Sequence, residues 1–207
     1  MSFKYLPIDK DYISIWATGL STALVPDVEK QFCLDNTFTI ALNYCTDIEP
    51  HARMWMDWKV SEWISDRYIA CPDIHLISRP KAFPKGTDIP IKEHVHYWFD
   101  EDEDGLDMNY TLWLLYQLIK KYFPEKTVIL YGVDCEKDRT SLKIINGEKV
   151  REKDHLGQDL HLDNICLFTL QEKNNEPDYI TNKWFNTNFE SGVEAITKRT
   201  IYDIIQD

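Results

Sequence analysis

The chain has 207 residues, of which 43% are hydrophobic and 13% aromatic, and this is enough to bury the core of one large domain. We therefore expect a single domain over residues 1–207. Its 23 Lys and Arg residues stand against 35 Asp and Glu residues, a formal charge of -12, and this acidic excess opposes binding to a nucleic-acid backbone. No apolar run approaches the ~20 residues of a membrane span, and the first residues carry no apolar signal-peptide region.

The cysteines bear on the cellular compartment. They are odd in number and widely spaced, and no two form a CxxC pair: Cys33, Cys45, Cys71, Cys135 and Cys166. This usage is typical of reduced, unpaired thiols rather than of a disulfide framework. We expect a soluble, cytoplasmic protein.

The first expected strand covers residues 12–17 and ends in the turn Thr18-Gly19-Leu20-Ser21. Apolar residues then recur at helical spacing, at Ala23, Leu24, Val28 and Phe32. A helix that begins near Ser21 would present unpaired amides and its positive dipole end, which suit a phosphate or carboxylate. Gly19 and Ser21 are therefore candidate anion-binding residues, although one glycine after a strand is also ordinary turn chemistry.

The next two expected strands also end in polar residues. Thr37–Leu42 ends at Asn43, and Arg53–Met56 ends at Asp57 before a helix over Lys59–Ile64. An asparagine amide offers a donor and an acceptor to a ligand base or sugar. Both residues also have a simpler interpretation, in which Asn43 forms a turn and Asp57 caps the segment that follows it.

The middle of the chain contains a strand, a loop and an acidic run. A strand is expected over residues 74–78 and a loop over residues 79–90, where Pro and Gly break both periodicities. The acidic run Asp100–Asp104 contains an Asp-x-Asp pattern that many nucleotide-sugar transferases use to hold a divalent metal, but such runs are also typical of solvated loops. An EF-hand is excluded because Thr111 stands where its bidentate Glu belongs.

The strongest pattern is a helix that runs into a strand. Apolar residues at three- and four-residue spacing predict a helix over residues 112–123, which Pro124 ends. Thr127–Tyr131 is apolar and β-branched without polar alternation, as expected of an interior strand covered on both faces. It ends in Gly132-Val133-Asp134, and ligands of open α/β sheets bind outside the carboxyl ends of the strands. Gly132 and Asp134 are therefore candidate site residues.

Beyond this strand, Asn146-Gly147 predicts a hairpin between residues 142–145 and 149–151. His155 follows in a loop and is of the residue type that titrates near neutrality, which suits a general acid or base, although a lone histidine is more often structural. The remaining expected elements are a helix from Leu160 to about Lys173, a strand over Ile180–Phe185 and a helix over Thr200–Ile205.

The alternation of strands and helices predicts an α/β fold with a Rossmann-like, doubly wound, mostly parallel sheet, and with the hairpin as a small excursion. Parallel strands present their carboxyl ends along one edge. We therefore predict that Gly19, Ser21, Asn43, Asp57 and Asp134 line one crevice. In the alternative hypothesis they are separate turn and cap residues.

The order of these strand ends resembles a known superfamily. The residues that carry the resemblance are Gly19-Leu20-Ser21, Ala41-Leu42-Asn43, Trp55-Met56-Asp57, Leu130-Tyr131-Gly132-Val133-Asp134, and Trp184-Phe185-Asn186 followed by Ser191. They are similar to the Rossmann-like superfamily that joins hydroxymethylpterin diphosphokinase-like (MptE-like) domains with small bacterial sialyltransferases and related, often phage-encoded, glycosyltransferase-like proteins. The resemblance covers about residues 12–205.

The resemblance implies roles for several residues. Asn43 would lie at the nucleotide and donor-sugar site, and Asp57, Gly132 and Asp134 would match the family's strand-end positions. His155 would stand where sialyltransferase-like members carry a catalytic histidine. The second glycine usual in the first loop of the family is absent, with Thr18 near its place.

Three hypotheses follow. In the first, the protein is a nucleotide-dependent, glycosyltransferase-like transferase that moves a glycosyl group from a nucleotide-linked donor to a small acceptor, and a homo-oligomer is compatible with it. Its residues would be Gly19, Ser21, Asn43 and Gly132 at the donor, Asp57 and Asp134 at the donor or at Mg²⁺ or Mn²⁺, and His155 with Asp134 in catalysis. In the second, it is a diphosphokinase that transfers pyrophosphate from ATP to a small heterocyclic alcohol and requires magnesium. In the third, it is a catalytically inactive binding or structural protein of the same fold.

Overall fold

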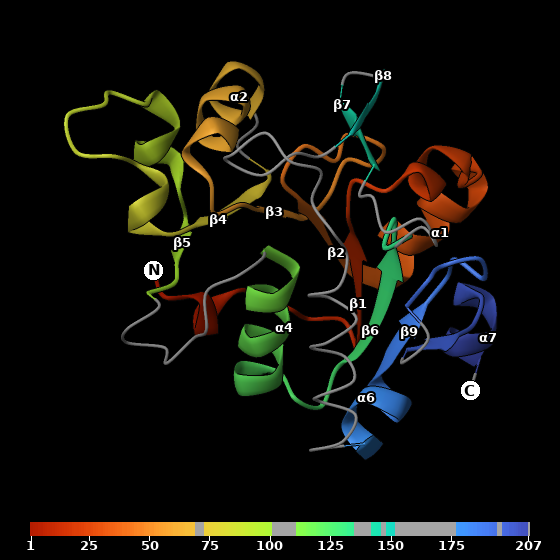
Figure 1. Cartoon of the computed structure of the whole chain (residues 1–207). Coiled ribbons are helices and arrows are strands. Elements are labelled where there is room, and N and C mark those ends of the chain that lie inside the picture. The colour runs from red at the N-terminus through yellow and green to blue at the C-terminus, as the bar shows by residue number, and fades with distance from the viewer. Residues whose placement is uncertain are drawn as a thin grey trace.

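The computed structural model describes residues 1–68, 73–100, 111–134, 142–145, 148–151, 177–193 and 196–206 (Figure 1). Eight strands form one sheet in the order β10-β9-β6-β1-β2-β3-β4-β5, and every neighbouring pair is parallel. The strands are β1 (Tyr12–Trp16), β2 (Thr37–Leu42), β3 (Ala52–Met54), β4 (His75–Ser78), β5 (Tyr97–Trp98), β6 (Thr127–Tyr131), β9 (Trp184–Asn186) and β10 (Thr197–Lys198). The predicted α/β fold with a parallel sheet is confirmed.

Strand β6 is an interior strand, as its continuous apolar sequence predicts. It pairs with β1 on one side, Tyr12 opposite Thr127, and with β9 on the other, Val128 opposite Trp184. Its residues from Val128 to Tyr131 are buried. Both faces of the strand therefore contribute to the core.

Helices cover both faces of the sheet. On one face, α4 (Thr111–Tyr122) and α6 (Pro177–Lys183) pack with the largest apolar cluster (Figure 1). On the other face, α1 (Asp27–Asn36) and α7 (Ile201–Gln206) pack in a second cluster, and α2 (Trp58–Tyr68) packs in a third. The fold is therefore doubly wound.

The predicted hairpin is also confirmed. β7 (Leu142–Ile145) and β8 (Glu148–Arg151) pair in antiparallel orientation as a separate two-stranded sheet. The two turn residues between them lie outside the described residues. Four short 3₁₀ helices complete the described elements: η1 (Phe3–Tyr5), η2 (Leu20–Leu24), η3 (Pro80–Ala82) and η4 (Pro90–His94).

Two predicted elements differ from the structure. The helix expected to begin near Ser21 is divided at Pro26 into η2 and α1, and the side chains of Leu24 and Val28 are 82% and 73% exposed rather than packed on the sheet. The strand expected over Ile180–Phe185 is instead the end of α6 followed by β9. Pro177 is the first residue of α6, a position that tolerates proline because the first turn of a helix does not use that amide.

Two further predictions concern cysteines and membranes. Cys33 and Cys45 are free and buried, and the other three cysteines lie outside the described residues. Among the helices that the structure describes, none has the length and apolar character needed to span a bilayer.

The strand order defines one special position. From β1 the chain proceeds through β2, β3, β4 and β5 in one direction, and β6 then pairs with the opposite side of β1. The direction of winding thus reverses between β1 and β6. In open α/β sheets the crevice beyond the carboxyl ends of such a strand pair is where ligands bind.

Candidate functional site

The loops that leave β1 and β6 touch each other at two glycines. The amide of Gly19 donates to the carbonyl of Gly132 at 3.0 Å, and a Cβ atom on Gly19 would lie 2.2 Å from that carbonyl oxygen. Gly132 has a φ of 69°, in the left-handed region that favours glycine. A side chain at Gly19 does not fit this contact, and one at Gly132 would be strained.

The carboxylate of Asp134 binds the same loop. Its Oδ2 accepts the amide of Ser21 at 2.9 Å, and its Oδ1 accepts the Ser21 hydroxyl and the side-chain amide of Asn188, the latter at 2.9 Å. Asp134 therefore occupies the position beside the Ser21 amide that the sequence suggested for a phosphate or carboxylate. The anion in this turn belongs to the chain itself.

The loop after β9 surrounds the same residues. The side-chain amide of Asn186 and the hydroxyl of Ser191 both donate to the carbonyl of Val133, at 3.0 and 2.7 Å. The amide of Gly192 donates to the carbonyl of Asp134 at 2.9 Å. Three loops far apart in sequence thus meet beyond β1, β6 and β9. Asn188 is not among the residues predicted from the sequence, because nothing local marks its contact with a residue 54 positions away.

Asn43 lies one strand away, at the carboxyl end of β2. Its φ of 47° is left-handed, a conformation that asparagine tolerates better than most residues. Its Oδ1 accepts the hydroxyl of Thr111, the first residue of α4, at 3.1 Å, and its carbonyl accepts Nη1 of Arg53 at 2.9 Å. Its side-chain Nδ2 makes no hydrogen bond to any described residue and is a donor at the edge of the sheet.

The loops after β1 and β2 are also joined. The buried hydroxyl of Thr22 lies 2.7 Å from the carbonyl oxygen of Gly19 and 2.6 Å from Oδ2 of Asp47. This contact connects Asn43 and its loop to the Gly19 turn. The loops that follow β6, β1 and β2 are therefore linked by hydrogen bonds at the carboxyl edge of the sheet.

Asp57 has the simpler of its two predicted roles in this structure. Its Oδ1 accepts the amide of Lys59 at 2.8 Å and its carbonyl accepts the amide of Val60 at 3.1 Å, so it caps the N-terminus of α2. Strands β1 and β2 separate its strand from that of Asp134, a gap of three strand spacings or about 14 Å. Asp57 and Asp134 do not fit as ligands of one metal ion.

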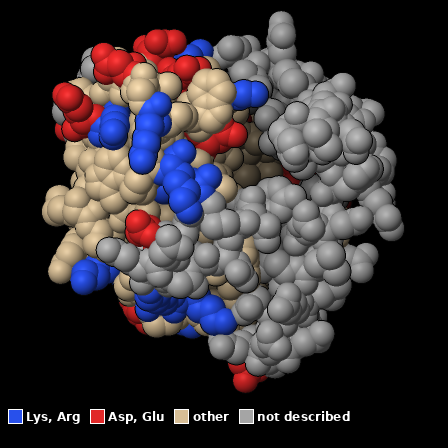
Figure 2. Space-filling model, turned by 60° about the vertical axis from the view of Figure 1, so that its left-hand side comes forward, with Lys and Arg blue, Asp and Glu red and all other residues tan. Residues whose placement is uncertain are grey.

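No group of three or more His, Cys, Asp and Glu side chains with metal-binding geometry exists within the part of the chain that the structure describes. His155 and residues 101–104 of the acidic run lie outside the described residues. Figure 2 shows acidic and basic side chains interspersed on the described part of the face it presents, without a continuous basic footprint.

Arg53 is a residue of this edge that the sequence did not single out. It lies in the middle of β3, its side chain is 0% exposed, and its guanidinium reaches the Asn43 turn. Burial lowers the pKa of this group, and interactions with Tyr68 and Cys45 oppose the shift. A charged residue inside the apolar run of β3 was the signal that could have drawn attention to it.

Comparison with known proteins adds no assignment. The sequence matches no protein-family model and no curated protein. The resemblance to the MptE-like and sialyltransferase-like proteins therefore rests on the strand-end residues alone.

Proposed function

We propose that this protein is a nucleotide-dependent transferase of the glycosyltransferase-like kind, which binds a nucleotide-linked donor beyond the carboxyl ends of β6, β1 and β2. The observation that carries this proposal is the position of Asn43. Its side-chain donor is unused by the described residues, it lies beside the first turn of α4, and it is one strand from the point where the winding reverses.

The arrangement supports a division of roles. The N-terminal turn of α4, a helix of 12 residues, offers its positive dipole end to the donor phosphate next to Asn43. Gly19, Ser21 and Asp134 have a structural role beside the donor. The amide and hydroxyl of Ser21 already donate to the Asp134 carboxylate, so they do not bind the ligand.

The transfer reaction requires two kinds of group. Hydrogen-bond donors stabilise the departing nucleotide phosphate, and a base takes the proton of the acceptor hydroxyl. The resemblance implies His155 as that base. We assign no step to a divalent metal, since Asp57 and Asp134 do not fit one ion.

One observation favours a second candidate function, that of a binding protein without turnover. The amide and hydroxyl of Ser21, which would cradle a phosphate, are bound by Asp134 of the same chain. A fold that has lost catalysis tolerates such an internal contact. The diphosphokinase hypothesis has less support, because it needs carboxylates that gather around magnesium.

The test is nucleotide binding to paired asparagine variants. Calorimetric titration with nucleotides and nucleotide sugars, with and without Mg²⁺ or Mn²⁺, identifies the tightest ligand. Asn43→Gly removes the amide but keeps the left-handed backbone, and we expect about tenfold weaker binding, the effect of one lost hydrogen bond. Asn36→Ala is the matched control, because it removes an asparagine that lies before β2, at the opposite edge of the sheet.

The outcomes separate the candidates. Transfer of the sugar to water or an acceptor, together with the Asn43→Gly effect, supports the transferase. Nucleotide binding with the Asn43→Gly effect but without turnover supports the inactive protein. Equal affinity in wild type, Asn43→Gly and Asn36→Ala removes Asn43 from the donor site, and with it the proposal.

A further inference from the structure

The guanidinium of Arg53 has a hydrogen-bonding edge that no described residue uses. Nη1 donates to the carbonyl of Asn43, but Nε and Nη2 are both buried and have no hydrogen-bond partner among the described residues. No described carboxylate forms an ion pair with it. Of the buried side chains that the structure describes, Arg53 is the only one that carries a full charge.

The surroundings of Arg53 are aromatic rather than acidic. The ring centroid of Tyr68 lies 4.5 Å from Cζ and that of Trp63 lies 6.0 Å from it. Tyr44 packs edge-on against Trp63, with centroids 5.2 Å apart. These rings stabilise a cation through their faces, and none of them carries the negative charge that would balance the guanidinium.

A second buried donor lies in the same cluster. The indole Nε1 of Trp63 is also buried without a hydrogen-bond partner in the described part of the chain. Buried donors in native proteins nearly always have a partner, and an orphaned one indicates a bound water, ion or ligand. An arginine stays charged even when buried, so neutral water satisfies its donors without balancing its charge.

The geometry of the unused edge identifies the class of ligand. Nε and Nη2 form the side-on fork of a guanidinium, which donates two parallel hydrogen bonds to the oxygens of one carboxylate or phosphate. We propose that Arg53 is the anchor of an oxyanion-binding site, in which a carboxylate or phosphate group of a small ligand binds the Nε–Nη2 edge next to Trp63. Tyr44, Trp63 and Tyr68 are each partly exposed and mark the side of the cluster from which a ligand would enter.

This site is distinct from the donor-binding residues proposed above and adjoins them through the Asn43 carbonyl. The hydrogen bond from Nη1 fixes the orientation of the guanidinium, so that the free edge points away from Asn43. The site therefore extends the carboxyl edge toward β3 and α2.

The experiment measures oxyanion binding without any nucleotide. Inorganic phosphate and acetate are each titrated against chloride at constant ionic strength, with melting temperature and calorimetry as readouts. We expect phosphate, acetate or both to raise the melting temperature of the wild type in a saturable way, and the stronger of the two identifies the group. Arg53→Met should weaken this binding about 10- to 100-fold, because a charge-assisted bidentate contact is lost.

Two further substitutions, one at Arg53 and one at Arg67, are the controls. Arg53→Lys keeps the charge but lacks the fork, so binding should be intermediate, and it serves if Arg53→Met does not fold. Arg67→Met removes the same charge from an exposed position on α2, where Arg67 lies 4.3 Å from the ring centroid of Trp63. It should change oxyanion affinity less than twofold.

Several results would overturn the site. The first is that phosphate and acetate stabilise the wild type no more than chloride does. The second is that Arg53→Met binds the oxyanion with unchanged affinity, and the third is that Arg67→Met loses as much affinity as Arg53→Met. Oxyanion binding that depends on Arg53 in a protein that binds no nucleotide would retain this site and remove the proposed transferase. Nucleotide binding that is unchanged in Arg53→Met, without any oxyanion effect, would retain the proposed transferase and remove the oxyanion site.

Discussion

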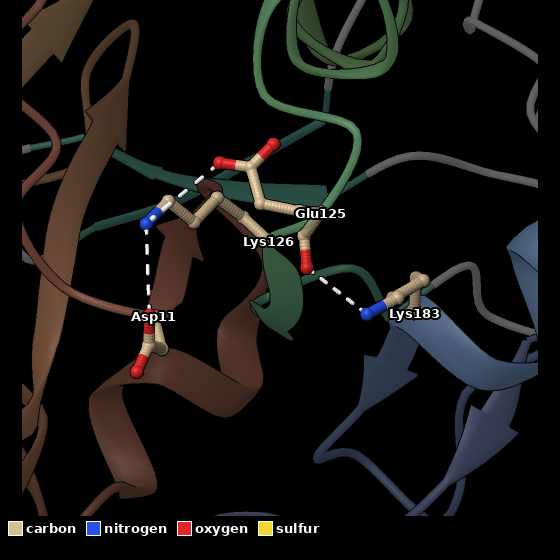
Figure 3. A network of polar contacts seen from close by, with 4 residues as sticks. All are labelled: Asp11, Glu125, Lys126 and Lys183. Atoms are coloured by element: carbon tan, nitrogen blue, oxygen red, sulfur yellow. Dashed lines mark hydrogen bonds and ion pairs between the residues drawn. The ribbon is translucent and has the colours of Figure 1, made fainter.

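At the amino ends of β1 and β6 the connecting segments are joined by charged side chains at the surface, whereas at the carboxyl ends they are joined by part-buried hydrogen bonds. Figure 3 shows the amino side, where Nζ of Lys126 lies 3.7 Å from Asp11 and 3.8 Å from Glu125, and Lys183 donates to the carbonyl of Glu125 at 3.0 Å. The side chain of Asp11 is 95% exposed. Water competes for each of these contacts.

At the carboxyl side, the connecting segments are in close backbone contact and share part-buried hydrogen bonds. Asp134 accepts hydrogen bonds from two loops, and the backbones at Gly19 and Gly132 touch. Hydrogen bonds to a part-buried charge are worth more than exposed ion pairs, because an unmet donor cannot recover its bond to water. Strand pairing joins β1 and β6 along their length, and the contrast predicts that the side-chain contacts at the carboxyl edge add more to stability than those at the amino edge.

The largest expected effect comes from Gly19→Ala. The added Cβ would lie 2.2 Å from the Gly132 carbonyl oxygen and 2.6 Å from Oδ2 of Asp134, so the two loops would have to separate. We expect the free energy of unfolding to fall by about 3 kcal/mol in urea denaturation. Gly86→Ala is the control, since Gly86 has a φ of 86° but open space around it, and its cost should be about 1 kcal/mol. Equal losses in the two variants would show that the contact at Gly19 is not tight.

The second effect separates the two predicted strand-end carboxylates. Asp134→Ala leaves the amide and hydroxyl of Ser21 and the side chain of Asn188 without their acceptor, so stability should fall by about 2 kcal/mol. Asp57→Ala removes only a helix cap and should cost about 1 kcal/mol. Both are measured by urea denaturation at one pH. A larger loss in Asp57→Ala would contradict the importance assigned to the Asp134 contacts.

The sequence predicted the central features of this edge for clear reasons. The apolar run Thr127–Tyr131 has no polar alternation, and only an interior strand accommodates that. Once the sheet is parallel, the strand ends at Gly19 and Gly132 must lie along one edge, and the reversal of winding brings them together. The interior position of Thr127–Tyr131 follows from its local sequence, whereas the reversal of winding between β1 and β6 is seen only in the strand order of the structure.

What the sequence did not show depends on tertiary partners. Ser21 and Asp134 are 113 residues apart, so no local pattern indicated that the carboxylate fills the turn. Nothing in the sequence indicated that Nε and Nη2 of Arg53 lack hydrogen-bond acceptors among the described residues, because that depends on which residues surround the side chain in the fold. Leu24 and Val28 matched helical spacing, but Pro26 between them places each in a different helix.

The amino edge of the other half of the sheet has its own distinctive residues. His51 immediately precedes β3, His75 begins β4 and His96 immediately precedes β5. Nδ1 of His51 accepts the amide of Thr39 at 3.0 Å, and Nδ1 of His96 accepts the amide of Leu76 at 3.1 Å. A histidine that accepts at Nδ1 must be neutral, so protonation breaks these bonds.

The third prediction follows as a dependence on pH. Burial lowers the pKa of all three histidines below 6.5, helped for His51 by Lys10 and for His75 by the neighbouring histidines. The unfolded chain therefore binds more protons than the folded one as the pH falls. The contribution of these histidines to the free energy of unfolding is fully present above the unfolded pKa and is lost as the pH decreases below about 6.5. Urea denaturation between pH 7.5 and 5.5 measures the slope.

A pair of histidine variants tests whether this dependence of stability on pH comes from the amino edge. His96→Gln keeps an acceptor for the Leu76 amide but cannot titrate, so the loss of stability between pH 7.5 and 5.5 should shrink, by no more than about 1 kcal/mol for one neutral hydrogen bond. His94→Gln is the comparison variant: His94 is exposed and makes no such bond in the described structure, but its charge helps to lower the pKa of His96, so this variant should change the slope less than His96→Gln does. An unchanged slope in His96→Gln would exclude His96 as its source.

The smallest effect is expected at the charge network of Figure 3. Lys126→Met keeps the length of the side chain, which is only 13% exposed, and removes the two ion pairs to Asp11 and Glu125. We expect a change below about 0.5 kcal/mol in urea denaturation at 150 mM salt, because both carboxylate partners are exposed, at 95% and 64%, and such pairs are weak and screened. Lys126→Ala should cost more, since it also removes the packed stem. If Lys126→Met instead cost as much as Asp134→Ala, the amino and carboxyl edges would contribute equally to the β1–β6 junction, and the contrast between them would be lost.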